Sequence, residues 1–322
     1  FCIQLERQHD KFEYKKNKSF QIKVEEKEKE KFIKRFPFLP TNSQKKSIQT
    51  ILEDMSKSFP MSRLLEGDVG SGKTAVAATA AYTVVKQRPN GQNFGNLQVA
   101  YMAPTEILAT QHFESFIQYF KHLPINVGLI TGSGCRKFPS KVASKILRPA
   151  DASRGAFATT KNDLPSQDGM QATEDASAGR QNWTDISRSQ LLKWTAEGII
   201  PILIGTHALI QKSVKFKNLA LVVIDEQHRF GTAQRRKLVR KDGVAPHLLS
   251  MTATPIPRTL ALTIYGDLDL SLLDEMPAGR KQIITEIITP NKRDETYEKI
   301  RTELKNGRQL YVICPRIEEP DP

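Results

Sequence analysis

Short apolar runs alternate with helical patterns through most of the chain. Six runs are predicted as strands: Arg63–Asp68, Gln98–Ala103, Val127–Thr131, Pro201–Gly205, Leu219–Asp225 and His247–Thr252. Apolar residues recur at helical spacing in Lys73–Gln87, Glu106–His122 and Gln234–Lys241. The Leu219–Ile224 run is apolar at every position, which is typical of a strand buried on both faces. The pattern predicts an α/β fold with a parallel sheet that has helices on both faces.

Two segments break this alternation before residue 275. Residues 1–35 are dense in Lys and Glu, and we expect a charged helix or linker that leads into a domain spanning residues 36–275. Thr41 or Asn42 is expected to cap the first helix of that domain. Residues 134–182 lack apolar periodicity and are rich in small and polar residues, so we expect a disordered insertion there.

The last part of the chain, residues 276–322, predicts the start of a second α/β domain. The segment Lys281–Thr289 is followed by a helix near Asp294–Asn306 and by a strand at Gln309–Cys314. The chain begins at Phe1 without a Met and stops at Pro322, which suggests a piece of a longer protein.

The composition shows a net positive charge and argues against a membrane-spanning protein and against a disulfide- or metal-stabilised one. Lys and Arg total 48 against 35 acidic residues, a net charge of +13. This excess fits a polyanion binder or simply a basic surface, and charge alone does not separate the two. No apolar run reaches the roughly 18 residues of a membrane helix. Cys2, Cys135 and Cys314 are too far apart for a disulfide framework or metal-ligand spacing, so reduced thiols are expected.

A glycine-rich loop after the first predicted strand carries the strongest chemical signal. It matches the pattern G-x-x-x-x-G-K-T and consists of Gly67, Asp68, Val69, Gly70, Ser71, Gly72, Lys73 and Thr74. In this context the backbone N–H groups cradle phosphate oxygens at a helix N-terminus. Lys73 is expected to pair with the outer phosphates and Thr74 to offer a hydroxyl to Mg²⁺. A plain turn would not need Lys-Thr at this offset, so the loop predicts ATP binding.

Asp225 and Glu226 follow the Leu219–Ile224 run and give the second signal. A carboxylate at the end of a parallel strand lies at the edge where α/β folds bind ligands. We expect Asp225 to hold Mg²⁺, through water, and Glu226 to orient and polarise the attacking water, with Lys73 as the third catalytic group. An apolar strand that ends in Asp-Glu is common by itself, but the phosphate loop upstream favours the functional interpretation.

Two weaker signals flank these motifs. The Gln44 amide can both donate to and accept from an adenine edge, and Phe38 could pack on the base, although an exposed helical glutamine is the ordinary alternative. Thr252 and Thr254 are hydroxyl residues at a strand end that can exchange hydrogen-bond partners with the nucleotide state. Without the other motifs, a turn after a buried strand would explain them equally well.

Taken together, these motifs occur in helicase order, and the chain resembles the RecG family of ATP-dependent DNA helicases, which are two-lobed motors. The resemblance covers about residues 36–133 and 190–320. It is carried by Thr41–Gln44, Gly67–Thr74, Met102–Ala109, Thr131–Ser133, Gly205–Gln211, Asp225–Gly231 and Thr252–Leu260.

The resemblance implies a RecA-like P-loop NTPase domain, followed by the beginning of a second RecA-like domain. It also implies ATP and Mg²⁺ as cofactors, branched or forked DNA as partner, a monomer, and a bacterial cytoplasmic location. Gln227 and His228, with the two threonines, would couple the ATP site to the DNA-binding state. The implied phosphate-backbone contacts are Pro104, Thr105, Thr131, Gly132, Thr206 and His207.

The sequence also departs from the family. Pro40 stands where such chains usually have Leu, and the 134–182 segment is not a family feature. The later motifs of the second lobe, including the arginine that reaches the γ-phosphate, and the wedge domain that splits branched DNA are absent from these residues. Little unwinding is therefore expected from this chain alone. An RNA helicase, a duplex translocase like the transcription-repair coupling factor, and a non-catalytic nucleotide-binding module remain alternatives.

Overall fold

A computed structural model describes most of the chain. The described residues are 9, 11–23, 25–89, 96–140, 183–206, 209, 213–226, 244–254, 268–276 and 284–313. The chain divides into two compact units, residues 1–278 and 279–322, and each is described by itself.

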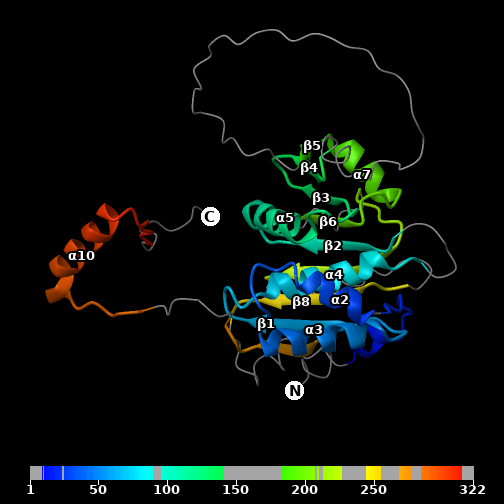
Figure 1. The fold of residues 1–322 in the computed structure, drawn as a ribbon, viewed down its shortest axis with the longest axis horizontal. Helices are drawn as coiled ribbons and strands as arrows, with labels where there is room; N and C mark the ends of the chain where they lie inside the picture. Colours follow the sequence, from blue (N-terminus) through cyan, green and yellow to red (C-terminus); the bar gives the residue numbers. More distant parts are fainter. Residues whose placement is uncertain are drawn as a thin grey trace, which may run out of the picture. The chain divides into compact units, whose positions relative to one another are not determined.

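The described strands of the first unit form one nine-stranded sheet (Figure 1). The strands are β1 (Ser62–Gly67), β2 (Gln98–Met102), β3 (Val127–Ile130), β4 (Cys135–Phe138), β5 (Thr184–Asp185), β6 (Ile202–Gly205), β7 (Leu219–Asp225), β8 (His247–Thr252) and β9 (Asp269–Leu273). Their order is β5-β4-β3-β6-β2-β7-β8-β1-β9. The six predicted strands are confirmed, with bounds that agree to within one residue.

All neighbouring strands from β3 to β9 in this order are parallel, whereas β4 and β5 add an antiparallel edge. The central strands β2, β6, β7 and β8 are buried along almost their whole length. Because parallel strands share one direction, the motifs that follow β1, β2, β7 and β8 lie at the same edge of the sheet.

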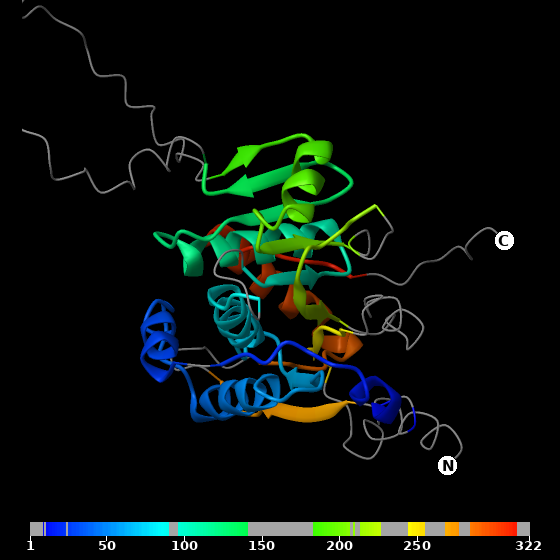
Figure 2. The ribbon, with the colours of Figure 1, turned by 90° about the vertical axis from the view of Figure 1, so that its right-hand side faces the viewer.

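Helices cover both faces of the sheet, as predicted. On one face lie α3 (Asn42–Met55), α4 (Lys73–Lys86) and α5 (Glu106–Phe120), and α2 (Glu26–Ile33) packs on α4, as Figures 1 and 2 show. The larger apolar core lies between these helices and the sheet. On the other face α7 (Arg188–Ala196) contributes Leu191 to a second apolar cluster with Leu203 and Val222.

Local chemistry explains where the two helices next to the phosphate loop begin. Thr41 caps α3 and forms a capping box with Gln44, because each side chain accepts a hydrogen bond from the other residue's backbone N–H. Helix α4 is rich in alanine, a strong helix former, and buries every position from Ala75 to Val85. Its small side chains let the helix approach the sheet closely.

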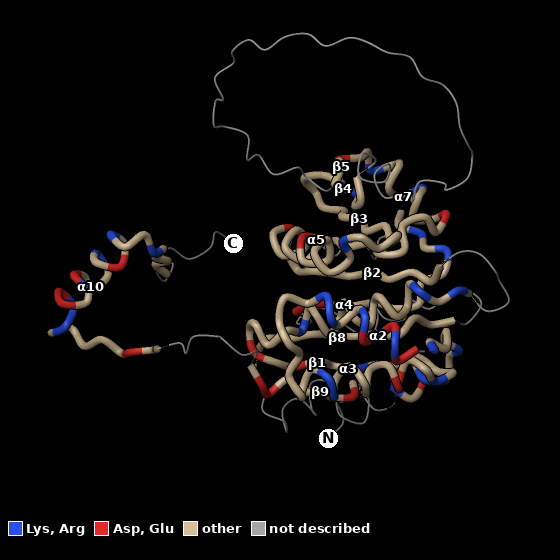
Figure 3. Tube along the Cα trace, viewed as in Figure 1, with Lys and Arg blue, Asp and Glu red and all other residues tan. Residues whose placement is uncertain are grey.

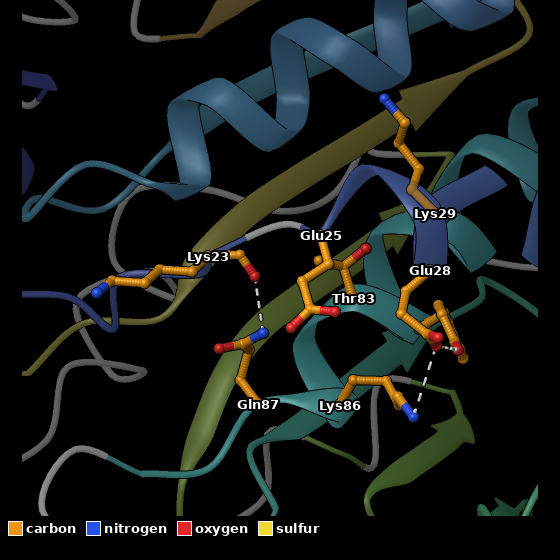
Figure 4. Close-up of a pocket in the computed structure, with 8 residues that line it drawn as sticks. Lys23, Glu25, Glu28, Lys29, Thr83, Lys86 and Gln87 are labelled. Atoms are coloured by element: carbon orange, nitrogen blue, oxygen red, sulfur yellow. Dashed lines mark hydrogen bonds and ion pairs between the residues drawn. The ribbon is translucent and has the colours of Figure 1, made fainter. Parts of the chain in front are cut away.

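The N-terminal segment contains a charged helix, α2, as the sequence allows, and its described residues pack on the domain expected to begin at residue 36. Ile22 and Phe32 are fully buried, and Phe32 stacks on Tyr82 of α4 with the ring centroids 4.2 Å apart. Figure 4 shows Lys23 and α2 facing α4, where Gln87 donates a hydrogen bond to the Lys23 carbonyl. The segment packs on the domain through a few apolar side chains, which are difficult to recognise in the sequence among so many charged residues.

The predicted start of the disordered insertion, residue 134, is too early in the chain. Cys135–Phe138 forms β4, which pairs antiparallel with β3, and Arg136 stacks on Trp183 beside β5. The short strand escapes prediction because its two middle residues are basic. Residues 141–182 lie outside the described residues, as does the predicted helix Gln234–Lys241.

The second unit contains the predicted helix, observed as α10 (Arg293–Lys305), after a short 3₁₀ turn η2 (Pro290–Lys292). The strand expected at Gln309–Cys314 is wrong over residues 309–313, which form no strand. Tyr311, Val312 and Ile313 are largely exposed, and no neighbouring strand in the described part of this unit offers them a pairing edge.

Two properties of the described residues bear on possible partners. No helix among them is long and apolar enough to cross a membrane. Figure 3 shows Lys and Arg on α2 and α10 interleaved with Asp and Glu, so the basic residues of these helices form mixed surfaces. Charge alone therefore does not identify a binding face.

Candidate nucleotide-binding site

The glycine-rich loop between β1 and α4 has the backbone geometry of a phosphate cradle. Gly70 and Gly72 have φ angles of 80° and 86°, a left-handed conformation that side chains strongly disfavour. Gly72 also occupies the N-cap position of α4, where no side chain caps the helix. The first N–H groups of α4 thus remain available to an anion, with the positive end of the helix dipole behind them.

Lys73 lies across this loop. Its ammonium group donates hydrogen bonds to the carbonyls of Gly67, at 2.6 Å, and Asp68, at 2.9 Å. Burial lowers the pKa of Lys73, while the negative charges of Asp225, Glu226 and Asp68 act in the opposite direction. The lysine thus lies within reach of the carboxylate charges, and a bound phosphate would replace its contacts with the loop carbonyls.

Gln44 packs directly against the loop and is almost completely buried, unlike an ordinary helical glutamine. Its Nε2 donates a 2.7 Å hydrogen bond to the carbonyl of Ser71, and its Oε1 accepts one from the Thr41 N–H. A Cβ atom on Gly72 would come within 2.3 Å of Gln44 Nε2. The amide keeps one hydrogen and one lone pair for a ligand, so its adenine contact stays a prediction.

The two predicted carboxylates lie at the end of β7. Glu226 has a φ of 50°, which is unusual outside glycine and costs on the order of 1–3 kcal/mol. Such strain is concentrated at functional sites. Glu226 Oε1 accepts a 3.1 Å hydrogen bond from the N–H of Ala253, so one oxygen is held by the loop after β8.

Asp225 has a partner that the sequence did not indicate. Its Oδ2 lies 2.7 Å from Nε2 of His112, which projects from α5. The other ring nitrogen of His112, Nδ1, lies 3.2 Å from the hydroxyl of Tyr101 on β2. Tyr101 and His112 are buried, and helical periodicity by itself marks His112 only as a core position.

The predicted coupling residues are described in part. Thr252 is buried at the end of β8, and its Oγ1 accepts a hydrogen bond from the backbone N–H of the exposed Thr254. Ala253, which follows Thr252, donates a hydrogen bond to Glu226, so the loop after β8 contacts this carboxylate, and the coupling role stays a prediction. Gln227 and His228 lie outside the described residues.

Of the residues expected to contact nucleic acid, Thr105 and Gly132 are exposed at the same edge of the sheet. Thr105 caps α5 and accepts a hydrogen bond from the Leu108 N–H. The Glu106 carboxylate accepts hydrogen bonds from the backbone N–H groups of Gly132, at 2.6 Å, and Ser133, at 3.3 Å. The Ser133 and Gly132 contacts lower the pKa of Glu106. Sequence reasoning missed this glutamate, which links the two predicted contact loops.

Five further predicted residues remain. Phe38 stacks on Phe36 with ring centroids 5.7 Å apart and stays partly exposed. Thr131 is buried and donates a hydrogen bond to the Gly134 carbonyl, whereas Pro104 and Thr206 are half-buried after β2 and β6. His207 lies outside the described residues.

The residues at the loop fit a magnesium ion that also binds phosphate. Thr74 offers a hydroxyl and Asp225 a carboxylate, and Mg²⁺ prefers oxygen ligands and usually binds one or two protein groups with phosphates and water. Among the described residues, no cluster of three His, Cys, Asp or Glu could hold a metal by itself. A site that uses the nucleotide as co-ligand agrees with this donor set.

Comparison with protein families and solved structures agrees with this geometry. The model of the DEAD/DEAH box helicase family matches residues 41–152 and 170–263. The chain is 43% identical over its full length to ATP-dependent DNA helicase RecG of Aquifex aeolicus and covers 34% of that protein. It is 40% identical to RecG of Thermotoga maritima, again over 100% of this chain and 34% of the relative. The chain thus spans about a third of the length of these curated relatives.

Two solved structures have the same architecture. A RecG bound to a three-way DNA junction is 35% identical, with a TM-score of 0.71 over 98% of this chain and 35% of that one. A DNA-bound DUF1998 helicase MrfA is 17% identical, with a TM-score of 0.51 over 90% of this chain and 36% of that one, which supports the fold alone.

Proposed function

The chain belongs to the DEAD/DEAH box helicase family, and we propose that it is the ATP-binding lobe of an ATP-dependent DNA helicase that acts on branched DNA. Its substrates would be forks and recombination junctions in DNA repair and recombination, in the bacterial cytoplasm. The main support is the loop between β1 and α4, where α4 begins without a side-chain cap and Lys73 interacts with the negative charges of Asp225 and Glu226. The identity to RecG proteins over the whole chain favours DNA.

Within this proposal each site residue has one task. The loop N–H groups and Lys73 would bind the phosphates, and Thr74 and Asp225 would hold Mg²⁺, which would neutralise developing charge on the phosphates. Glu226, held by the Ala253 N–H, would orient and polarise the attacking water. Phosphoryl transfer depends mainly on such positioning and charge stabilisation.

Three substitutions test the proposed catalytic groups. Lys73→Ala should abolish ATP binding, measured with a fluorescent ATP analogue, without loss of the fold, because Lys73 is only half-buried. Glu226→Gln should retain Mg-ATP binding and slow hydrolysis by orders of magnitude, whereas Asp225→Asn should weaken the dependence on Mg²⁺. Equal loss of binding in the two carboxylate variants would contradict this division of tasks, and a non-catalytic module would show no slower turnover in Glu226→Gln.

Competition binding tests the nucleic acid. We expect DNA to displace a labelled duplex more effectively than RNA of equal charge, with affinity that falls steeply as salt rises. Motor lobes contact mainly the phosphate backbone, so the comparison needs matched lengths. Preferential binding of RNA would support the RNA helicase alternative.

A further inference from the structure

A row of buried polar side chains lies behind the two predicted magnesium ligands. Tyr101 is completely buried in β2, and its ring lies 4.7 Å from the ring of His112, which is buried on α5. The Tyr101 hydroxyl, both nitrogens of His112 and Oδ2 of Asp225 form a continuous series at 3.2 and 2.7 Å. Burying polar groups costs free energy unless they form hydrogen bonds, so the hydrogen bonds within this series offset the cost of burying it.

The direction of each hydrogen bond follows from the chemistry of its partners. A carboxylate can only accept, so His112 Nε2 must donate to Asp225. In a neutral imidazole the other nitrogen, Nδ1, then accepts, and the Tyr101 hydroxyl must donate to it. Burial raises the pKa of Tyr101 well above 10, so the phenol keeps its proton.

The series continues on the other side of Tyr101. The Thr74 side chain is a hydrogen-bond partner of the Tyr101 hydroxyl, a contact that partly opposes the rise of the Tyr101 pKa. Because Tyr101 donates its only proton to His112, it accepts the proton of Thr74. The lone pairs of Thr74 and the second oxygen of Asp225, Oδ1, are left for a metal.

We propose that Tyr101 and His112 are positioning residues that fix the orientation of both magnesium ligands, Thr74 and Asp225, through one chain of hydrogen bonds. This inference rests on the proposed ATP-binding function. Groups that hold metal ligands in orientation typically contribute 10- to 100-fold to metal affinity or activity. The same chain joins helices α4 and α5 to the end of β7.

His247 provides a matched comparison within the chain. It is as deeply buried as Tyr101, and its ring contacts the N–H of Met61 on Nδ1 and the carbonyl of Phe20 and hydroxyl of Ser19 on Nε2. His247 and Met61 lie at the N-terminal ends of β8 and β1, whereas the phosphate loop follows the carboxyl end of β1, so His247 holds the fold together away from the site. A generic effect of removing a buried histidine should therefore be visible in His247 and separable from an effect on the metal.

The test measures binding of a fluorescent ATP analogue to the whole chain as MgCl₂ is titrated, together with thermal unfolding. His112→Phe should raise the half-saturating Mg²⁺ concentration about tenfold or more and leave nucleotide binding in EDTA unchanged. His112→Gln, whose amide can donate to Asp225 and accept from Tyr101, should restore most of the Mg²⁺ response. Tyr101→Phe, which removes one oxygen, should raise the half-saturating Mg²⁺ concentration, as His112→Phe does. His247→Phe should lower the unfolding temperature without changing the half-saturating Mg²⁺ concentration.

Each contrary result has its own meaning. A wild-type Mg²⁺ response in both His112→Phe and Tyr101→Phe would overturn the positioning role, even if both unfold earlier. An equal shift in His247→Phe would also overturn it, because the effect would then be one of general stability. Failure of the wild-type chain to bind the nucleotide at any Mg²⁺ concentration would instead overturn the proposed function. If His112→Phe does not fold, the single-oxygen change Tyr101→Phe decides the question.

Discussion

Removal of the Gln44 side chain should weaken both the phosphate loop and its helix. Gln44→Ala deletes the hydrogen bond to the Ser71 carbonyl and the half of the capping box that satisfies the Thr41 N–H. A lost helix cap costs about 1 kcal/mol, and a buried group without its partner about 1–3 kcal/mol. The sum of about 2–4 kcal/mol corresponds to a fall in Tm of roughly 5–10 °C for a domain of this size.

Nucleotide affinity should fall in the same variant, because Gln44 fixes the loop conformation before the phosphate arrives. Loss of one hydrogen bond of about 1.4 kcal/mol corresponds to about a tenfold higher Kd for ATP. Gln44→Glu separates the two tasks of the amide. A carboxylate still accepts from the Thr41 N–H, but it cannot donate to the Ser71 carbonyl and places a negative charge beside the phosphate loop. We expect it to bind ATP at least as weakly as Gln44→Ala.

Differential scanning fluorimetry and titration with a fluorescent ATP analogue measure both effects. Gln49→Ala is the matched control, since Gln49 lies on the same helix, is exposed, and, among the described residues, bonds only the side chains of Glu53 and Lys29. Wild-type ATP affinity in Gln44→Ala, with a Tm equal to that of Gln49→Ala, would refute the role of Gln44 in fixing the conformation of the phosphate loop. A change in preference for adenine over guanine without a change in Tm would identify Gln44 as a base contact instead.

Three further changes have outcomes that the structure predicts. Gly72→Ala should abolish ATP binding, because the residue has a φ of 86° and its Cβ would meet Gln44 at 2.3 Å, whereas Gly134→Ala, with open space around it, should bind normally. Burial lowers the pKa of His247 from 6.5 to about 4. The unfolded chain therefore binds more protons between these values, and urea unfolding should show a loss of about 3 kcal/mol as pH falls from 6.5 to 4, a slope that His247→Gln should remove. Deleting residues 136–182 should lower Tm because it removes most of β4, whereas deleting 153–169, which the family match leaves out, should not; equal Tm values would contradict this.

The central fold could be predicted from sequence because its signals are local. Strands such as Leu219–Asp225 are apolar at every position, and α4 follows directly from the glycine-rich loop. The strands that escaped prediction have polar residues whose partners lie far away in the chain. In β9, Asp269 pairs with Lys11 and Ser271 accepts from Arg63, over separations of 258 and 208 residues. Sequence periodicity carries no record of such pairs.

The same distinction holds within the site. The phosphate loop was predictable because eight consecutive residues contain its geometry and its chemistry. The His112–Asp225 pair spans 113 residues, and the Gln44–Ser71 contact joins a helix to a loop 27 residues away. The chemistry of the Gln44 amide suggested an adenine contact, but only the structure shows that the amide is buried against the loop.

Helix α5 joins the loop expected to contact nucleic acid to the proposed nucleotide site through His112. Its N-cap is Thr105, on the exposed loop expected to contact nucleic acid, and Glu106 in its first turn holds the Gly132 loop. His112 follows Thr105 by seven positions, about 10 Å along a helix. A helix is stiff over that length, so a displacement of its N-terminus by bound phosphate would reach the 2.7 Å contact with Asp225 with little attenuation. The proposed metal-binding carboxylate and the loop expected to contact nucleic acid thus both contact one rigid helix, which would give the lobe a direct physical route between the two proposed sites.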